Sequence, residues 1–351
     1  MQNKKTHVIG LMSGTSLDGV DIVSVSFNDN YKFEIIHSDT IPYTDGWKQK
    51  LKNAFNQSEV EIEKLDIEYG EFLGELINTF LKDNSIEKID FIASHGHTIF
   101  HKPEEGYTLQ IGDGEKIAAI TNQKVVCDFR SQDVELGGQG APLVPIGDQL
   151  LFAEYDYCLN LGGFANISFD ESGIRKAFDI CPVNIVMNHY ANQLGFEYDD
   201  EGKLASEGEI NNELLDELNQ LPFYKGSIPK SLGYEFVVSD IFPLIDKYKL
   251  SIKDVLRTFV AHTIFQISKK IASNGKLLIT GGGAFNSFMI AELEKNTSVE
   301  LVIPSSTIIN YKEALIFAFL GLLRIENKVN CLQSVTGAKK DHSSGVIYIP
   351  N

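Results

Sequence analysis

The stretch GLMSGTSLDGVD, residues 10–21, decides the fold of this chain. It follows a strand-like run, THVI, and leads into a second one, VDIVSVSF. A tight hairpin needs only two turn residues, but this bend is longer and combines glycines with serine, threonine and aspartate. Glycine lets the backbone approach a ligand closely, and successive backbone N–H groups in such a bend can surround an anion. The stretch therefore predicts an anion-binding turn between two buried strands.

Both halves of the chain repeat one plan of strands and helices. In the first half, strands are expected at residues 6–12, 20–27, 32–41, 88–96 and 123–129, and helices at 47–56 and 59–83. In the second half, strands are expected within 155–171, at 174–180, at the start of 275–286 and at 299–305, with helices at 255–272 and 312–328. Strands that alternate with helices indicate an α/β sheet covered by helices. The repeated plan suggests a duplication, and the glycine-rich run at 135–145 predicts a boundary or hinge.

Size and charge narrow the class of protein. With 351 residues the chain exceeds the usual size of one hydrophobic core, which predicts two domains. Its net charge of −17 argues against binding to nucleic acid or to anionic membranes, since both need a basic face. We find no signal peptide and no run of about 20 apolar residues. The four cysteines lie far apart, which favours reduced thiols in a cytoplasmic protein over a disulfide framework.

Glycine-rich bends recur along the chain as SGTSLDG, GGQGAP, NLGGFANIS and TGGGAFN. One such bend alone is more often a tight turn than a ligand site. Two of them occupy matching positions in the two halves, and the fourth joins a strand to a helix, which suits a nucleotide. Neither a Walker A motif nor a Rossmann fingerprint is present. The paired bends therefore favour a nucleotide bound outside the strand ends.

Over nearly its whole length the chain resembles the anhydro-N-acetylmuramic acid kinases, which belong to the actin/hexokinase/Hsp70 ATPase superfamily. The blocks that carry the resemblance are GLMSGTSLDGVD (10–21), SHGHTIFH (94–101), TLQIGDGEKIA (108–118), VVCDFRSQDVELGGQGAPLVP (125–145), NLGGFANIS (160–168), TGGGAFN (280–286) and EALIFAFLG (313–321). The resemblance implies two duplicated ribonuclease H-like (actin-like ATPase) domains with a ligand cleft between them. Residues 1–135 would form the N-terminal domain with sugar-binding insertions. Residues 136–351 would form the C-terminal domain, with the adenosine site and the catalytic aspartate.

The resemblance also implies a reaction. These kinases use ATP and Mg²⁺ to open the 1,6-anhydro bridge of 1,6-anhydro-N-acetylmuramic acid with water and to phosphorylate O6. The product, N-acetylmuramic acid 6-phosphate, belongs to cell-wall recycling. The partners would be ATP and the sugar, and the sequence does not decide whether the protein forms a homodimer. Because DICPVN and SLGYE depart from the family's usual DTGPGN and STGRE, a non-catalytic nucleotide- or sugar-binding sensor and a kinase for a related anhydro sugar remain alternatives.

The resemblance places ATP on the paired bends and on the TGGGAFN turn. The implied nucleotide-binding residues are Ser13, Gly14, Thr15, Ser16, Asp18, Gly19, Asp21, Asn160, Gly162, Gly163, Asn166, Gly281, Gly282 and Gly283. Relatives elsewhere in the superfamily carry an aspartate at the end of each first strand, where this chain has Met12 and Asn160. Asp18 or Asp21 is therefore the expected magnesium ligand, although Asp18 also makes a good turn pair with the glycine after it.

Two carboxylates are candidates for catalysis. Asp179 in AFDICPVN matches the family's catalytic aspartate, which implies that it is the base for the attacking water. The alternative is an N-cap for a helix that starts at Val183. Glu313 matches a family position that faces the cleft, and its alternative is dipole compensation in the first turn of the last long helix.

The sugar side is expected around the SHGHTIFH and DFRSQD blocks. The implied sugar-binding residues are His95, Thr98, Asp128, Arg130 and Asp133. The guanidinium of Arg130 could bind the lactyl carboxylate through two hydrogen bonds. An internal ion pair with Asp128 or Asp133 is equally compatible with the sequence. Zinc bound by the histidines of the first block is disfavoured, because no cysteine or carboxylate lies nearby at a matching spacing.

Overall fold

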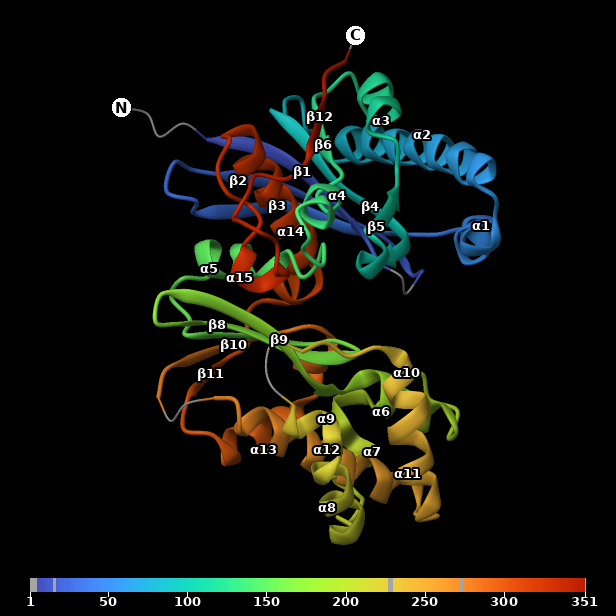
Figure 1. The fold of residues 1–351 in the computed structure, drawn as a ribbon, viewed down its shortest axis with the longest axis vertical. Coiled ribbons are helices and arrows are strands. Elements are labelled where there is room, and N and C mark those ends of the chain that lie inside the picture. The colour runs from blue at the N-terminus through green and yellow to red at the C-terminus, as the bar shows by residue number, and fades with distance from the viewer. Residues whose placement is uncertain (1–4, 15–16, 227–229, 272–273, 351) are drawn as a thin grey trace. The chain divides into compact units, whose positions relative to one another are not determined.

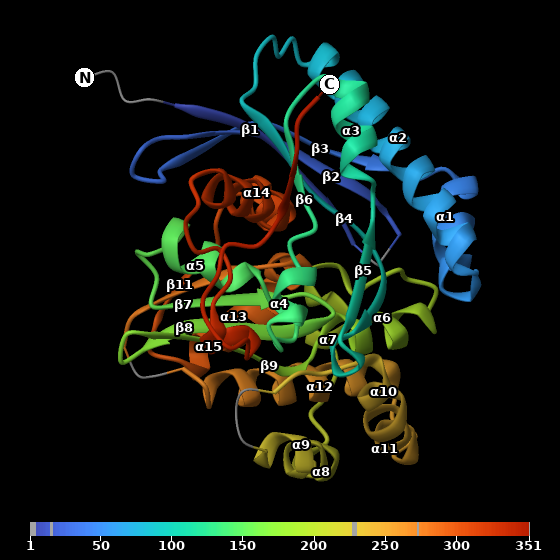
Figure 2. The same cartoon turned by 45° about the horizontal axis from the view of Figure 1, so that its top comes forward.

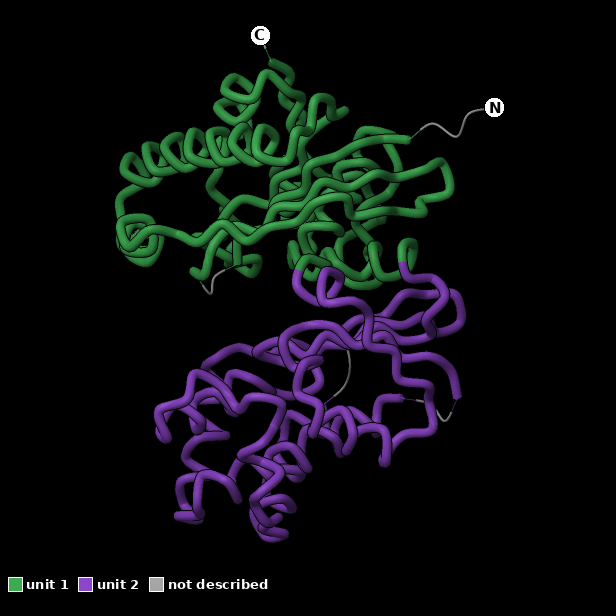
Figure 3. The backbone as a smooth tube through the Cα atoms, turned by 180° about the vertical axis from the view of Figure 1, so that it is seen from behind, with its two compact units in different colours: residues 1–151, 311–351 green, residues 152–310 purple. Residues whose placement is uncertain are grey.

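The computed structural model describes residues 5–14, 17–226, 230–271 and 274–350. The chain folds into two compact units, one formed by residues 1–151 and 311–351 and the other by residues 152–310 (Figure 3). This division does not coincide with the predicted boundary between residues 135 and 136. The helix at Val144–Leu151 belongs to the first unit because its Asp148 forms a buried ion pair of 2.7 Å with Lys312. The C-terminal segment also returns to the first unit.

The sheet of unit 1 has the order β12-β6-β4-β1-β2-β3, with β5 paired to β4. Its strands are β1 (Thr6–Ser13), β2 (Gly19–Phe27), β3 (Phe33–Pro42), β4 (Phe91–Lys102), β5 (Tyr107–Ile111), β6 (Val125–Cys127) and β12 (Val346–Tyr348). Pairing is antiparallel from β1 through β2 to β3, whereas β1, β4 and β6 run parallel. The first glycine bend, between β1 and β2, therefore lies at the end of the central strand β1.

Helices cover both faces of this sheet. They are α1 (Asp45–Asn53), α2 (Glu59–Asp83), α3 (Gly114–Thr121), α4 (Ser131–Glu135), α5 (Val144–Leu151), α14 (Ser306–Ile325) and α15 (Gln333–Thr336). Figures 1 and 2 show α2 and α3 on one face and α14 on the other. Ile9 and Leu11 of β1 join the core under α2 and α3. Gly10 faces α14, where a Cβ atom would lie only 2.3 Å from the Ala314 carbonyl oxygen, so glycine permits this close packing.

The sheet of unit 2 has the order β11-β10-β7-β8-β9. Its strands are β7 (Tyr157–Leu161), β8 (Phe164–Glu171), β9 (Ile174–Pro182), β10 (Lys276–Thr280) and β11 (Glu300–Val302). The helices are α6 (Asn184–Asn192), α7 (Lys203–Ser206), α8 (Asn212–Gln220), α9 (Pro222–Lys225), α10 (Tyr234–Phe236), α11 (Phe242–Lys247), α12 (Ile252–Ser268) and α13 (Ser287–Asn296). Leu159 and Leu161 of β7 pack into one core with Phe259 of α12.

The two units share one topology. In each, three consecutive antiparallel strands are joined by two strands that run parallel to the first. The shared order is β3-β2-β1-β4-β6 in unit 1 and β9-β8-β7-β10-β11 in unit 2. This is the ribonuclease H-like arrangement, and it confirms the predicted duplication. The sequence did not predict β5, β12 or the helices between β9 and α12, and α14 begins at Ser306 rather than at residue 312. None of the four cysteines, all of which lie within the described ranges, forms a disulfide. No helix within the described ranges is long and apolar enough to cross a membrane.

Candidate active site

A row of polar side chains crosses the first three strands of unit 2. Asn160 of β7 lies opposite Asn166 of β8, and Asn166 lies opposite Asp179 of β9. Directly paired residues point to the same face of a sheet, and successive residues alternate between faces. Because Leu159 and Leu161 point into the core under α12, the row faces away from that core. The strand register thus brings three of the predicted site residues together.

Unit 1 carries the equivalent row. Met12 of β1 lies opposite Asp21 of β2, and Asp21 lies opposite Thr40 of β3. The hydroxyl of Thr40 donates a hydrogen bond of 2.7 Å to Asp21 Oδ1 and lies 3.4 Å from the hydroxyl of Tyr311 on α14. Met12 and Asn160 therefore occupy matching positions in the duplicated sheets, as the sequence indicated. The carboxylate lies on the second strand in unit 1 and on the third strand in unit 2.

Asp179 is held by the segment that follows α9. Its Oδ2 accepts a hydrogen bond of 2.8 Å from the backbone N–H of Leu232, and its own N–H donates to the carbonyl of Lys230 at 2.9 Å. Burial raises the pKa of Asp179 above its ordinary value of 3.8, while the Leu232 hydrogen bond opposes this rise. The N-cap of α6 is Val183, and no side chain caps that helix. Asp179 is therefore a partly buried strand residue and not a helix cap.

This raised pKa predicts a pH-dependent stability difference for Asp179→Asn. The folded protein binds the Asp179 proton more tightly than the unfolded chain does. Ionisation of this carboxyl group therefore lowers the free energy of unfolding as pH rises through the raised pKa. Asparagine keeps an oxygen for the Leu232 N–H and carries no charge. The variant should therefore be more stable than the wild type at pH 7, with the gain fading below about pH 4. Denaturant unfolding at both pH values checks this, and a gain that does not depend on pH would contradict it.

The second glycine bend, between β7 and β8, is tied to the start of α6. The carbonyl of Gly162 accepts from the N–H of Asn184 at 3.3 Å, and the carbonyl of Gly163 accepts from Val183 at 2.8 Å and Ile185 at 3.3 Å. In a planar trans peptide the N–H of the next residue points opposite to the carbonyl, so the N–H of Gly163 points away from α6. A Cβ atom on Gly163 would meet only Ile185, at 3.7 Å. Packing within the protein does not demand glycine here, which leaves the backbone open to a ligand.

The third glycine bend follows β10. Gly281 has a φ of +80°, and a Cβ atom there would lie 2.6 Å from Asn160 Oδ1. A Cβ atom on Gly283 would lie 2.7 Å from the side chain of Leu161, whereas one on Gly282 would meet only Asn184 at 3.8 Å. Internal packing therefore explains the first and third glycines of this bend. Gly282, like Gly163, has no such reason and presents open backbone.

The first glycine bend begins at the buried Ser13. The hydroxyl of Ser13 donates to the carbonyl of Gly96 on β4 at 2.8 Å and accepts from the hydroxyl of Tyr69 on α2 at 2.9 Å. Gly14 accepts from the N–H of Leu17 at 3.4 Å. At Gly19 a Cβ atom would lie 2.3 Å from the Ile41 carbonyl oxygen, so close strand packing requires that glycine. Thr15 and Ser16 lie outside the described residues.

Two carboxylates stand beside the first bend. Asp18 is exposed, and Asp21 is half-buried in the row of unit 1. Burial raises the pKa of Asp21, the Thr40 hydrogen bond lowers it, and the negative charge of Asp18 raises it further. Mg²⁺ prefers oxygen ligands and is commonly held by one or two carboxylates together with substrate phosphates. The chemistry of this donor pair therefore fits Mg²⁺.

Arg130 and His95 are brought together in unit 1. Arg130 Nε donates to His95 Nε2 at 3.0 Å, and its Nη1 donates to the carbonyl of Gly140 at 2.7 Å. Asp128 instead accepts from the N–H of Ser131 at 3.2 Å. The alternative of an internal ion pair between Arg130 and a carboxylate of its own block is therefore not what the structure shows. The Arg130 side chain is only partly buried, and Nη2 is the guanidinium nitrogen that neither of these two hydrogen bonds uses.

The tautomer of His95 follows from these contacts. Because Nε2 accepts from Arg130, the proton lies on Nδ1, which is 2.9 Å from the carbonyl oxygen of Gly96. Burial, and then the positive charge of Arg130, hold the pKa of His95 well below its ordinary value. Burial also lowers the pKa of His97 to about 4. Thr98 Oγ1 accepts from Gln110 at 3.4 Å. His95 is thus a neutral, fixed group, and among the residues that the structure describes it forms no cluster with other potential metal ligands.

Asp133 and Glu313 lie in contrasting surroundings. Asp133 has no exposed surface and is enclosed by donors, among them the N–H of Gly140 at 2.7 Å and the hydroxyl of Thr336 at 2.7 Å. Its carboxylate therefore supports Gly140, whose carbonyl accepts from Arg130. Glu313 lies in the third turn of α14, which excludes the first-turn alternative, and water reaches its side chain. The pKa of Glu313 is raised mainly because surrounding protein displaces bulk solvent, while the charge of Arg130 opposes the rise.

Some residues of the site were missed from the sequence. Leu232 holds Asp179 through a backbone N–H, so its side chain carries no signal. Thr40 could have been found by aligning the third strands of the two halves, which place it opposite Asp21 as Asp179 lies opposite Asn166.

Comparison with known proteins assigns the chain to a family. Residues 6–350 match the family described as anhydro-N-acetylmuramic acid kinase. An anhydro-N-acetylmuramic acid kinase of Hydrogenovibrio crunogenus is 37% identical over 97% of this chain and 98% of the relative. Kinases of the same description from Haemophilus influenzae, at 33% identity, and Mannheimia succiniciproducens, at 35%, each cover 98% of this chain, and 98% and 99% of their own length are matched. The chain belongs to the anhydro-N-acetylmuramic acid kinase family.

Proposed function

We propose that this sugar kinase uses ATP and water to convert 1,6-anhydro-N-acetylmuramic acid into N-acetylmuramic acid 6-phosphate in the cytoplasm, as a step of cell-wall recycling. The observation that supports it best is Asp179, which is partly buried, is fixed by the backbone and aligns with Asn160 and Asn166 across three strands. An ADP-release assay with the anhydro sugar, ATP and Mg²⁺ tests the proposal. Turnover that depends on the sugar supports it, and its absence would refute it.

In the proposed reaction Asp179 acts as the general base. It accepts a proton from a water molecule as that water's oxygen forms a bond to the anomeric carbon. The bond between this carbon and O6 breaks, and its electron pair stays on O6. O6 then bonds to the γ-phosphorus of ATP as the bond to the β-phosphate oxygen breaks, so ADP leaves. The proton on Asp179 passes to solvent. Because burial raises its pKa, ionised Asp179 accepts a proton more readily than an ordinary aspartate.

The other residues would bind and orient the reactants. The open backbone at Gly163 and Gly282 suits phosphate oxygens, since backbone N–H groups can bind them without a side chain in the way. Asp18 and Asp21 would hold Mg²⁺, which would neutralise charge on the phosphates. Glu313 is a further candidate on the sugar side. Arg130, fixed by His95 and Gly140, would bind the lactyl carboxylate.

Arg130→Lys should raise the KM for the anhydro sugar by about 10- to 100-fold, because a hydrogen bond to a charged group contributes about 1.5–3 kcal/mol. Lysine cannot present two parallel N–H groups to a carboxylate. The penalty should shrink for an anhydro sugar that lacks the lactyl group. Steady-state kinetics with both sugars measure this, and Arg324→Lys, which also loses an arginine bond to a carbonyl, at Gly345, is the matched control. Equal penalties for both sugars would contradict the carboxylate contact.

The alternative of a binding protein without turnover rests on the DICPVN departure. Cys181 and Val183 replace two family glycines, yet both are fully buried in the core of unit 2. The N–H of Val183 still donates to the carbonyl of Gly163 and so supports the second bend. These replacements are therefore absorbed by packing on the side away from Asp179, and we favour a working kinase.

A further inference from the structure

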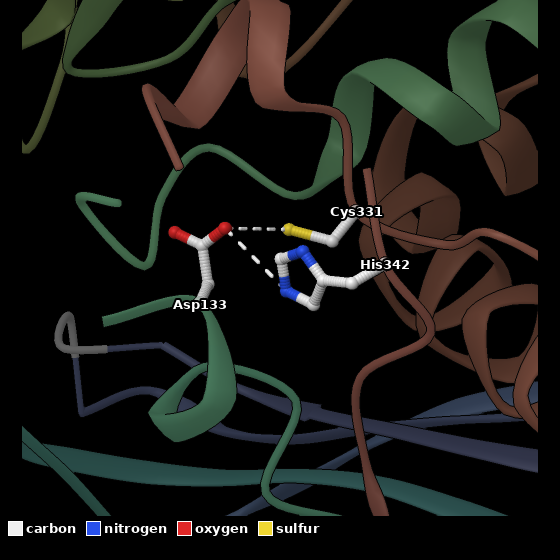
Figure 4. A group of neighbouring side chains, drawn as sticks. All are labelled: Asp133, Cys331 and His342. Carbon is white, nitrogen blue, oxygen red and sulfur yellow. Dashed lines mark hydrogen bonds and ion pairs between the residues drawn. The ribbon is translucent and has the colours of Figure 1, made fainter. Parts of the chain in front are cut away.

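The segment between α14 and β12 folds back against α4 and brings two potential metal ligands together. Cys331 and His342 form an isolated antiparallel bridge, in which the N–H of each donates to the carbonyl of the other at 3.1 Å. Side chains of directly paired antiparallel residues lie side by side. Figure 4 shows both side chains turned toward Asp133 of α4.

Asp133 completes a compact, buried group. The thiol of Cys331 donates to Asp133 Oδ1 at 3.0 Å, and His342 Nε2 lies 3.6 Å from the same oxygen. One ligand atom from each residue lies within 4.8 Å of the others. The exposed fractions are 0% for Asp133, 1% for Cys331 and 6% for His342. All three belong to unit 1.

The hydrogen bonds of His342 leave one ring nitrogen placed to bind a cation. Its Nδ1 lies 3.1 Å from the carbonyl oxygen of Lys340, and a carbonyl can only accept, so Nδ1 carries a proton. Nε2 is buried and makes no hydrogen bond. In the neutral ring, its lone pair therefore faces the carboxylate of Asp133. Histidines that bind metals commonly donate their other N–H to a backbone carbonyl in this way.

We propose that Asp133, Cys331 and His342 form a buried Zn²⁺ site. Zinc binds sulfur at about 2.3 Å and nitrogen or oxygen at about 2.0–2.2 Å, so its tetrahedral ligands stand about 3.3–3.7 Å apart. The separations from Asp133 Oδ1, 3.0 Å to Cys331 Sγ and 3.6 Å to His342 Nε2, lie close to this range, and all three ligand atoms lie within 4.8 Å of one another. Binding would release the Cys331 thiol proton to solvent, and the thiolate and carboxylate would then balance the charge of the ion. The three protein ligands leave a fourth position for water.

The location gives this site a structural role in unit 1. Gly140 links it to the sugar-side arginine, because the N–H of Gly140 donates to Asp133 Oδ2 while its carbonyl accepts from Arg130, both at 2.7 Å. Zinc would therefore fix the loop that orients Arg130 and would join the C-terminal segment to α4. This inference does not depend on the proposed reaction.

Cobalt substitution tests the site, since Co²⁺ bound to a thiolate absorbs by ligand-to-metal charge transfer. The full chain is refolded with Co²⁺, and separately produced in medium with added Zn²⁺ and analysed for bound metal. We expect one equivalent of metal and a charge-transfer band in the wild type. Cys331→Ser keeps a hydroxyl donor for Asp133 but loses the thiolate, so the band should vanish. His342→Gln should lower metal affinity at least tenfold, whereas Cys127→Ser, a buried cysteine outside the group, should behave as the wild type.

Thermal unfolding gives a second readout. Zinc at 100 times its dissociation constant should favour the folded wild type by about 100-fold in the unfolding equilibrium, and should not do so in Cys331→Ser. Less than about a tenth of an equivalent of metal in both preparations would overturn the proposal. A band that persists in Cys331→Ser would overturn it as well, and so would an imidazolium ring at His342 in the metal-treated wild type.

Discussion

Asp179→Asn should lower the turnover of the anhydro sugar by about 10²- to 10⁴-fold, the usual contribution of a general base. Asparagine has the same shape, and its oxygen can still accept from the N–H of Leu232. The variant therefore removes the proton acceptor and little else. Affinities for ATP and for the sugar should change little, because the glycine bends and Arg130 are not altered. Steady-state kinetics with calorimetric binding separate the two effects.

The control is Asp216→Asn on α8, where an exposed aspartate of the same unit loses its charge. It should leave turnover unchanged. A folded Asp179→Asn protein with near-normal turnover would remove Asp179 from the mechanism. A loss of turnover matched by an equal loss of sugar affinity would instead make Asp179 a binding residue.

Gly163→Ala and Gly282→Ala should each lower kcat/KM for ATP by about 10²-fold, the scale on which the loss of one hydrogen bond to a reacting anion acts, because the methyl group would keep the phosphate from the backbone N–H. At both positions the added methyl group meets protein atoms only at 3.7 Å or more, so the fold should tolerate it. The methyl group would instead occupy the space where a phosphate oxygen approaches the backbone. Kinetics at varied ATP concentration measure the effect, and thermal unfolding checks the fold.

Gly46→Ala is the matched control for these variants. It also has room for a Cβ atom, whose nearest neighbour would be Thr44 at 3.8 Å, but it belongs to α1 and not to a glycine bend. It should leave kcat/KM for ATP unchanged. If Gly163→Ala and Gly282→Ala bind ATP as tightly as the wild type, the open backbone at these bends does not contact the nucleotide.

Local sequence patterns predicted the strands that carry the site. The runs before and after the first and second glycine bends alternate or are continuously apolar, and they form β1, β2, β7 and β8 close to the predicted bounds. Asp179 could be placed near the end of a strand because apolar residues precede it and a proline follows. The duplication was visible because both halves repeat the order of strands and bends. These features depend on neighbouring residues, which a single sequence contains.

Long-range contacts could not be predicted in this way. The Cys331 thiol donates a hydrogen bond to Asp133, 198 residues earlier in the chain, and no local sequence pattern indicates that these two residues are in contact. The predicted boundary at residue 135 likewise rested on local glycines, whereas the compact units divide after residues 151 and 310. The glycines after Asp133 mark a loop that wraps around its carboxylate, through the N–H of Gly140, and not a break between units. The near neighbours of Arg130 in the sequence likewise do not include its partner, because Arg130 precedes α4 and bonds to His95 on β4.

The mass of the reaction product tests the central claim most directly. The purified protein is incubated with ATP, Mg²⁺ and 1,6-anhydro-N-acetylmuramic acid in water enriched in ¹⁸O, and the sugar is analysed by mass spectrometry. Our account predicts a product that is heavier by one phosphoryl group and one water, with a single ¹⁸O atom at the anomeric hydroxyl. A product that gains a phosphoryl group alone, with no ¹⁸O and an intact anhydro bridge, would contradict hydrolytic ring opening.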